Sequence, residues 1–239
     1  SFTNCKNLTK FTVKGSFDTL DIGLAAFYKC EKFSEFTILE SVETLNIEYS
    51  AFFECRDLDK FTIPKGVTNL SIGMRAFSGC YSLINFTILA RVTHLNIGEE
   101  AFSDCDRLTE FVIPKEVTNL SIKTQTFSNC AALDKFTIPT GVTNLSIEMW
   151  AFYDCDRLTE FTIPESVTTL NIDAGVFVGS SLEKFVVEGN IKKPEVNELA
   201  FNQSCKLQTI RIPNCNIEKF PIGEGKFVTN SWQRNNGIE

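Results

Sequence analysis

Cysteine and histidine are the residues of this chain with the widest chemical range, because both bind metals and both act in catalysis. The 239 residues include nine cysteines and a single histidine, His94. Seven of the cysteines recur every 25 residues, at Cys5, Cys30, Cys55, Cys80, Cys105, Cys130 and Cys155. Zinc sites draw on closely spaced ligands such as C-x-x-C, which this spacing does not provide. We therefore expect no metal site and no cofactor, and interpret the seven cysteines as a buried column.

The same spacing disfavours disulfides within that column. Neighbouring cysteines on stacked strands would lie about 5 Å apart, but their Cα–Cβ bonds would run parallel, a poor geometry for a bridge. Cys205 and Cys215 fall outside the pattern. They are the one pair whose bridging the sequence leaves open.

His94 stands where the corresponding repeat positions carry Asn69, Asn119 and Asn144. We interpret it as an exposed substitution, because no nucleophile with an orienting carboxylate is evident in the sequence. With a single imidazole there are few ways to build an acid–base or nucleophilic site at neutral pH. The expectation is therefore a chain with no catalytic residues, in which an enzyme is the most distant of three functions.

The elements that carry these residues follow from a 25-residue repeat. Two phenylalanine series keep step with the cysteines, one running from Phe2 to Phe177 and the other from Phe11 to Phe161. Within the unit 105–129, the stretches LTEFVI and VTNLSI each end in an alternation of apolar and other residues. That period of two predicts half-buried strands, and the Pro or Gly that follows the first stretch ends it. Each unit therefore predicts two short strands, a corner, and an AFxxC segment that is irregular or forms a single helical turn.

Such units cannot bury their apolar edge alone, so they must stack. The predicted fold is a leucine-rich-repeat solenoid, a β-rich right-handed coil with parallel sheets, since 25 residues fall within the ~20–29 of that repeat class. Residues 1–187 are expected to form about seven regular repeats. Residues 188–239 are expected to be degenerate terminal repeats and a C-terminal cap of the same domain, because the register breaks after Phe177.

The composition limits the classes of partner that the chain is expected to bind. A net charge of -7 and a pI near 5.0 disfavour nucleic acid, which is bound by neutralising phosphates with Lys and Arg. No apolar run approaches the ~18 residues of a transmembrane helix. No signal peptide is visible, and Ser1 opens in mid-repeat, as in a trimmed or mature fragment.

The string AFSGCYSLINFTI, with AFxxCxxLxxFTIPxxVTxL in the better units, resembles the BspA-like, or Treponema-pallidum-type, leucine-rich repeat family. The resemblance is strong over residues 1–177 and weak over 196–213. It implies an arc-shaped solenoid with the LxxFTI strands on the concave face and AFxxC on the convex side. It also implies a surface or secreted protein that adheres to host proteins or other cells. The unit here is about two residues longer than is common in the family, and the extra length precedes AF.

Two sets of residues are candidates for binding a partner. On the inferred concave face, one column reads Lys10, Glu35, Lys60, Asn85, Glu110, Lys135, Glu160 and Lys184. Opposite charges on adjacent strands stabilise stacking by roughly 0.2–1 kcal/mol per pair, so a self-neutralising ladder accounts for most of it. Lys60, Asn85, Glu110 and Lys135 are nevertheless its candidate contact residues.

The second set lies in the inserted residues before AF, which vary from unit to unit. They include Tyr49, Met74, Arg75 and Trp150, and these residue types are enriched at protein interfaces. Drift at tolerant loop positions is the competing explanation. The function expected is a protein-binding or adhesion module that uses the concave face or this variable edge, and the alternative is a structural spacer or stalk.

Overall fold

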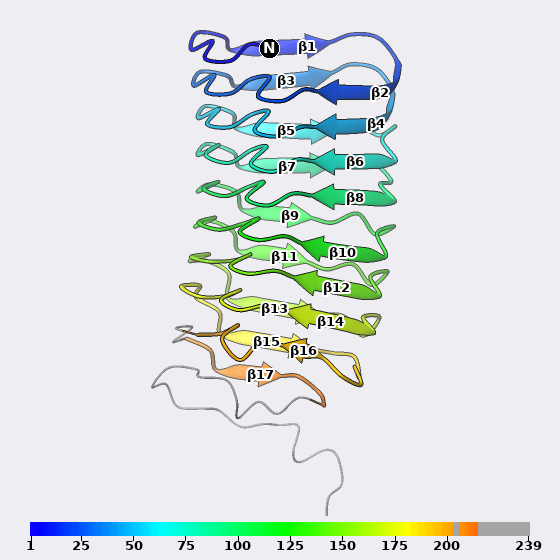
Figure 1. Ribbon diagram of the computed structural model, residues 1–239, viewed down its shortest axis with the longest axis vertical. Helices are drawn as coiled ribbons and strands as arrows, with labels where there is room; N and C mark the ends of the chain where they lie inside the picture. The colour runs from blue at the N-terminus through cyan, green and yellow to red at the C-terminus, as the bar shows by residue number, and fades with distance from the viewer. Residues whose placement is uncertain (203–205, 215–239) are drawn as a thin grey trace, which may run out of the picture.

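The structure is a computed structural model that describes residues 1–202 and 206–214. Figure 1 shows a column of stacked turns, each of which adds one strand to each of two faces. The predicted terminal cap from residue 215 onward, and both Cys205 and Cys215, lie outside the described residues.

The two strands predicted for each unit are present and alternate along the chain. The odd-numbered strands form the odd-strand face and are β1 (Lys10–Val13), β3 (Glu35–Ile38), β5 (Lys60–Ile63), β7 (Asn85–Ile88), β9 (Glu110–Val112), β11 (Lys135–Thr137), β13 (Glu160–Ile163), β15 (Lys184–Val187) and β17 (Thr209–Arg211). The even-numbered strands form the even-strand face and are β2 (Phe17–Ile22), β4 (Val42–Ile47), β6 (Asn69–Ile72), β8 (His94–Ile97), β10 (Asn119–Ile122), β12 (Asn144–Ile147), β14 (Thr169–Ile172) and β16 (Glu195–Val196). No helix occurs among the described residues.

All strand pairs are parallel, and their register follows the repeat. Phe61 lies opposite Phe86, and Leu120 lies opposite Leu145. The register loses one residue at the end of the regular repeats, where Phe161 pairs with Phe185. Stacking nevertheless continues, since β16 pairs with β14 and β17 with β15. The chain therefore forms a parallel β-solenoid of about eight turns, while the boundary at residue 187 stays a prediction.

The hydrogen bonding between stacked strands is interrupted at three places. The odd-strand face consists of the sheets β1-β3, β5-β7-β9-β11 and β13-β15-β17, and the even-strand face of β2-β4-β6-β8 and β10-β12-β14-β16. The repeat text is the same length on both sides of each break. We find no residue that explains the interruptions.

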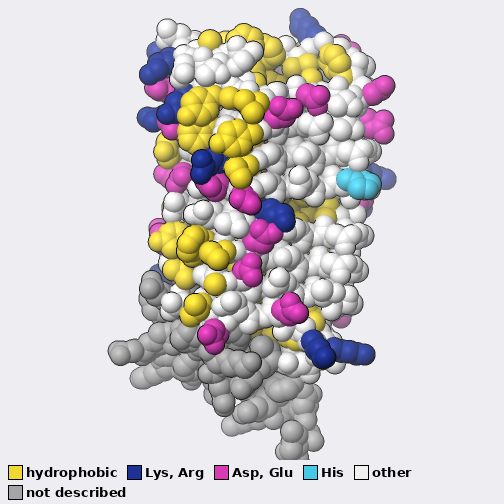
Figure 2. All heavy atoms as spheres, viewed as in Figure 1, with side chains coloured by type: hydrophobic (Ala, Val, Ile, Leu, Met, Phe, Trp, Pro, Cys, Tyr) yellow, Lys and Arg dark blue, Asp and Glu magenta, His cyan; other side chains and the backbone are white. Residues whose placement is uncertain are grey.

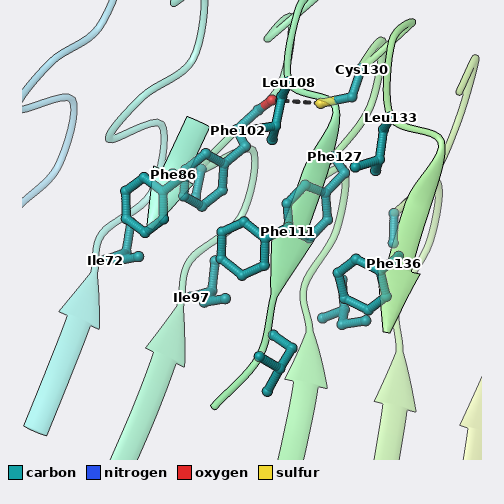
Figure 3. Packing of buried hydrophobic residues seen from close by; sticks show 14 of the residues in the cluster. Ile72, Phe86, Ile97, Phe102, Leu108, Phe111, Phe127, Cys130, Leu133 and Phe136 are labelled. Carbon is teal, nitrogen blue, oxygen red and sulfur yellow. Dashed lines mark hydrogen bonds between the residues drawn. The ribbon is translucent and has the colours of Figure 1, made fainter. Parts of the chain in front are cut away.

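Two columns of phenylalanine rings fill the core between the faces. Within a column the rings stack, as in Phe77 on Phe102, with centroids 5.3 Å apart and planes inclined by 3°. Between columns they meet edge to face, as in Phe86 on Phe102 at 4.9 Å and 77°. Figure 3 shows these rings with the inward residues of the even strands, such as Ile72 and Ile97, beside them. The predicted inward set is confirmed from the second turn onward.

Candidate functional site

The AFxxC segments form one edge of the solenoid, called here the turn edge. Two residues in each segment have a left-handed backbone, for example Gln125 (φ 54°) and Asn129 (φ 59°) in one turn. Successive turns with left-handed residues replace the helical turn that the sequence allowed, so that alternative is wrong. Glycine occupies such positions at Gly79, Gly175 and Gly179, where its lack of a Cβ removes the usual cost.

Backbone hydrogen bonds on this edge alternate between local and inter-turn partners. Gln125, Phe127 and Asn129 donate their N–H groups to the next turn, at 2.8–3.0 Å. Thr126, Ser128 and Cys130 donate to carbonyls three residues earlier in their own turn, at 3.2–3.3 Å. The edge is therefore a third ladder, and its N–H groups are occupied.

The cysteine thiols complete this ladder. Each buried thiol donates to the carbonyl of a phenylalanine 28 residues earlier, as Cys105 does to Phe77 at 3.3 Å and Cys130 to Phe102 at 3.1 Å (Figure 3). Burial raises the pKa of the Cys105 and Cys130 thiols well above the usual 9.0. Six of the seven repeat cysteines are buried, and the seventh, Cys5, is exposed. The prediction is wrong for Cys5, because the first turn has a neighbouring turn on one side only.

Two columns of side chains run along the turn edge, each stacked by these inter-turn hydrogen bonds. The first edge column consists of Leu24, Tyr49, Met74, Glu99, Thr124, Met149, Ala174 and Leu199. The second edge column consists of Tyr28, Phe53, Ser78, Ser103, Ser128, Tyr153 and Val178. Both columns are apolar or aromatic in the early and late turns and polar in the middle ones. Figure 2 shows the result as two groups of hydrophobic side chains on this edge.

The early group, the first patch, is built on stacked aromatic rings. Tyr28 lies on Phe53 with centroids 5.0 Å apart and planes inclined by 10°. The ammonium of Lys29 lies 5.4 Å from the Tyr28 ring, within cation–π range. Tyr49 (43% exposed) and Met74 (38%) continue the patch along the first edge column.

The late group, the second patch, is centred on Met149 and Trp150. Trp150 is 43% exposed, yet its indole has a fixed support. A Cβ added to Gly175 would lie 2.5 Å from Cδ1 and Nε1 of that indole, so only glycine lets the ring lie against the next turn. Tyr153, half-buried in the second edge column, extends this patch.

One turn between the patches is acidic, and its Asp104 and Asp106 recur as Asp154 and Asp156 in the turn of the second patch. Glu99, Asp104 and Asp106 have no ion pair among residues 1–202 and 206–214. Partial burial and the nearby Asp104 carboxylate raise the pKa of Asp106. Glu100, by contrast, is bound by Arg75 through two bonds, Nε–Oε2 at 2.8 Å and Nη2–Oε1 at 2.9 Å. We call Glu99, Asp104 and Asp106 the acidic centre.

The eight predicted contact residues thus separate into two groups. Tyr49, Met74, Arg75 and Trp150 lie on the turn edge. The side chains of Tyr49, Met74 and Trp150 are exposed, but Arg75 is committed to Glu100 and is not the free side chain that the sequence suggested. Sequence reasoning missed the contributions of Tyr28, Phe53 and Tyr153, which an alignment of the turn residues by the 25-residue period would have revealed.

The other four, Lys60, Asn85, Glu110 and Lys135, lie on β5, β7, β9 and β11 of the odd-strand face. The charge ladder there is partly confirmed, with ion pairs Lys10–Glu35 (2.7 Å), Glu110–Lys135 (3.2 Å) and Glu160–Lys184 (3.4 Å). Lys10 also lowers the pKa of Glu35 by a hydrogen bond and by its charge. All three pairs fall within a sheet, and none among the described residues crosses a sheet boundary.

His94 is exposed, and its Nδ1 lies 3.0 Å from Oγ1 of Thr93. It borders a shallow hollow of about 340 Å³ beside the break between β8 and β10, lined by neutral side chains such as Asn69, Asn96 and Asn119. Within the described part of the chain, no three His, Cys, Asp or Glu side chains are grouped so as to hold a metal ion. None of its elements is a helix of the length and apolarity that a membrane crossing needs.

The repeat text and the stacked turns match a known family. The family described as BspA type leucine rich repeat region matches in six copies, over residues 1–124 and 95–227. This chain belongs to the BspA-type leucine-rich repeat family. No curated protein matches it.

The chain is similar to solved structures of leucine-rich repeat proteins, and the first of these shares its fold. One from Bacteroides ovatus is 20% identical, with a TM-score of 0.51 over 88% of this chain and 68% of that one. A leucine-rich repeat protein of T. pallidum is 21% identical, with a TM-score of 0.46 over 76% of this chain and 71% of that one. A leucine-rich cell surface protein of Faecalibacterium prausnitzii is 19% identical, with a TM-score of 0.38 over 91% of this chain and 63% of that one.

Proposed function

We propose that this BspA-type repeat chain is a protein-binding or adhesion module of a surface or secreted protein, and that the turn edge recognises its protein partner. One observation carries the proposal: both edge columns place large apolar side chains in the same early and late turns. A core requirement would repeat in every unit, as the buried Phe and Cys positions do. The edge residues instead change from turn to turn, and the large ones of the first edge column, such as Tyr49, Met74 and Met149, are exposed.

The side chains on the edge are of the kinds that dominate protein interfaces. Tyr, Trp and Met are enriched there, and a few such anchors usually carry most of the binding energy. Trp150 is suited to that role because its indole already lies against Gly175 of the next turn, and an anchor that is placed before binding loses less entropy. A location at the cell surface or outside the cell rests on the family resemblance.

The odd-strand face is a weaker candidate surface. Glu110 and Lys135 neutralise each other at 3.2 Å, and most of this face repeats the same Thr and charged residues. Of the four predicted contact residues on this face, Lys60 and Asn85 have no ion pair in the described part of the chain. These two residues are the alternative contacts with a partner if the turn edge does not bind it.

Binding of the protein to an array of purified extracellular proteins tests the proposal. We expect Met74→Ser combined with Trp150→Ser to weaken a detected interaction at least tenfold, about 1.4 kcal/mol. Its thermal melt should stay close to that of the unchanged protein, because both side chains are substantially exposed. Val112→Ser with Leu89→Ser, two exposed apolar residues away from the edge, is the matched control.

The outcomes separate the surfaces and the functions. If only the Val112 and Leu89 variant loses binding, the partner is bound by the odd-strand face and not by the turn edge. If the Met74 and Trp150 variant binds with unchanged affinity, the turn edge is not the binding surface. If the unchanged protein binds nothing on the array, the stack serves better as a spacer or stalk that presents other domains.

A further inference from the structure

The two patches and the acidic centre occupy one continuous edge in a fixed order. In the first edge column the sequence of side chains is Tyr49, Met74, Glu99, Thr124 and Met149, each one turn from the next. The second edge column returns to an aromatic residue in the same turn, from Ser128 to Tyr153, but it becomes polar one turn earlier than the first, from Phe53 to Ser78. Both columns lack large apolar side chains in the turns of Glu99 and Thr124, so the gap between the two patches is a property of the edge rather than of one position.

The spacing of the strands sets the distance between the patches. Neighbouring turns lie about 4.8 Å apart, so Met74 and Met149, three turns apart, are separated by roughly 14 Å. Tyr49 and Met149, four turns apart, are separated by roughly 19 Å. An extended peptide advances about 3.3 Å per residue, so two of its side chains reach both patches when they are about four to six residues apart.

The negative charge between the two patches favours a partner segment with positively charged residues between its apolar side chains. The acidic centre has no cation to neutralise it in the described residues, although neighbouring carboxylates do: Glu54 contacts Arg56 at 2.8 Å and Glu148 contacts Lys123 at 2.7 Å. Asp104 accepts bonds from Ser103 and Asn129, which are neutral. A Lys or Arg brought to this turn meets carboxylates that no cation neutralises, whereas an acidic residue there is repelled.

From this arrangement we propose that the turn edge binds a linear segment of a protein partner, in which two apolar side chains four to six residues apart flank at least one Lys or Arg. The proposal rests on the protein-binding function proposed above and specifies its ligand. The apolar side chains sit on the first and second patches, and the cation meets the acidic centre.

The mode of binding follows from the edge backbone. Its N–H groups are already donated, alternately to the same turn and to the next one, so a partner strand cannot extend a sheet here. Four hollows of the described residues lie along the strand faces and corners rather than on this edge. Recognition therefore comes from side chains, and a flexible segment can place two anchors along a narrow ridge.

A display library of random 12-residue peptides tests the proposal directly. Panned against the unchanged protein, it should enrich peptides with two large apolar residues four to six positions apart and a Lys or Arg between them. Panned against Glu99→Lys with Asp106→Lys, it should keep the apolar pair but enrich Asp or Glu between them. A peptide selected on the unchanged protein should bind this variant at least tenfold more weakly.

A matched control changes the net charge equally at a distance from the edge. Glu43→Lys with Glu165→Lys adds the same four charges at exposed positions outside the turn edge, and it should enrich the same peptides as the unchanged protein. Circular dichroism melts confirm that all three proteins are folded before panning. Enrichment of no motif, of apolar pairs without a central cation, or of the same basic motif on the charge-reversed edge would each overturn the proposal.

This test separates the proposal from the function on which it rests. If the Met74 and Trp150 variant loses its array partner while the library yields no motif, the edge binds a folded surface and only the linear segment is refuted. If that variant keeps its partner, the binding function of the edge itself is refuted.

Discussion

The thiol of Cys130 donates a hydrogen bond to the carbonyl oxygen of Phe102, one turn earlier, over 3.1 Å. The same contact recurs for each of the six buried cysteines, at 3.0–3.3 Å. The cysteine column is therefore both a packing element and a hydrogen-bonding one, and its regular spacing needs no chemistry to explain it. Where the repeat has Ser180 instead, the hydroxyl donates within its own turn, to Phe177.

The six buried thiols should be unreactive in the folded protein. Because the thiolate is the reactive form and burial raises the pKa of Cys105 and Cys130, iodoacetamide at pH 8 should modify Cys5 and leave these two intact. Mass spectrometry of the digested protein identifies the labelled sites. After unfolding in urea all six should react, and rapid native labelling of Cys105 would place the column at the surface.

Stability should fall steeply above pH 9. The folded pKa of the buried thiols is raised above the ordinary 9.0, so the folded state retains protons that the unfolded chain releases. Their stabilising effect is complete below pH 9 and is lost as the pH rises from 9 towards the folded pKa. The loss of unfolding free energy per buried thiol should steepen above pH 9 and approach about 1.4 kcal/mol per pH unit.

Urea titrations at pH 8, 9 and 10 measure this loss. Cys130→Ala removes one such proton, so its stability should decline between pH 9 and 10 by about 1 kcal/mol less than that of the unchanged protein. An equal decline in both would mean that Cys130 ionises freely in the folded state.

Phe102→Ala should destabilise the protein by about 3–5 kcal/mol, the range for a buried phenylalanine. Phe102 is fully buried and stacks on both Phe77 and Phe127. Phe2, at 39% exposure, belongs to the same column and stacks on one ring of it, Phe27, so Phe2→Ala is the control and should cost markedly less. Denaturant melts decide it, and a loss below about 1 kcal/mol for Phe102→Ala would contradict the core assignment.

Left-handed positions on the turn edge should favour glycine. Gln125 has a φ of 54°, a conformation that costs a side-chain-bearing residue of order 1 kcal/mol. Gln125→Gly should therefore be neutral or stabilising by up to about 1 kcal/mol, and Gln125→Val, β-branched, should be destabilising by at least as much. Thermal melts compare the two, and greater stability of the valine variant would refute the turn geometry.

The sequence by itself determined the period, the two strands of each turn and the inward residues. Phe86 and Phe111 could be assigned to the core because a strand alternates its side chains and the repeat fixes which set is apolar. Stacking followed from the same pattern, since a single unit cannot cover its own apolar edge. The charge ladder was predictable for the pair Glu110 and Lys135, which are neighbours in any parallel register.

Only the tertiary structure determined which side chains of neighbouring turns contact one another and which backbone conformation each turn adopts. The acceptor of the Cys130 thiol lies 28 residues away, and the two left-handed residues of each AFxxC segment have no common residue type that the sequence could signal. Arg75 looked free until stacking brought Glu100 within 2.8 Å. The acidic centre between two apolar patches arises the same way, because residues 25 apart become neighbours only when the turns are stacked, and the turn geometry then sets which of them face outward.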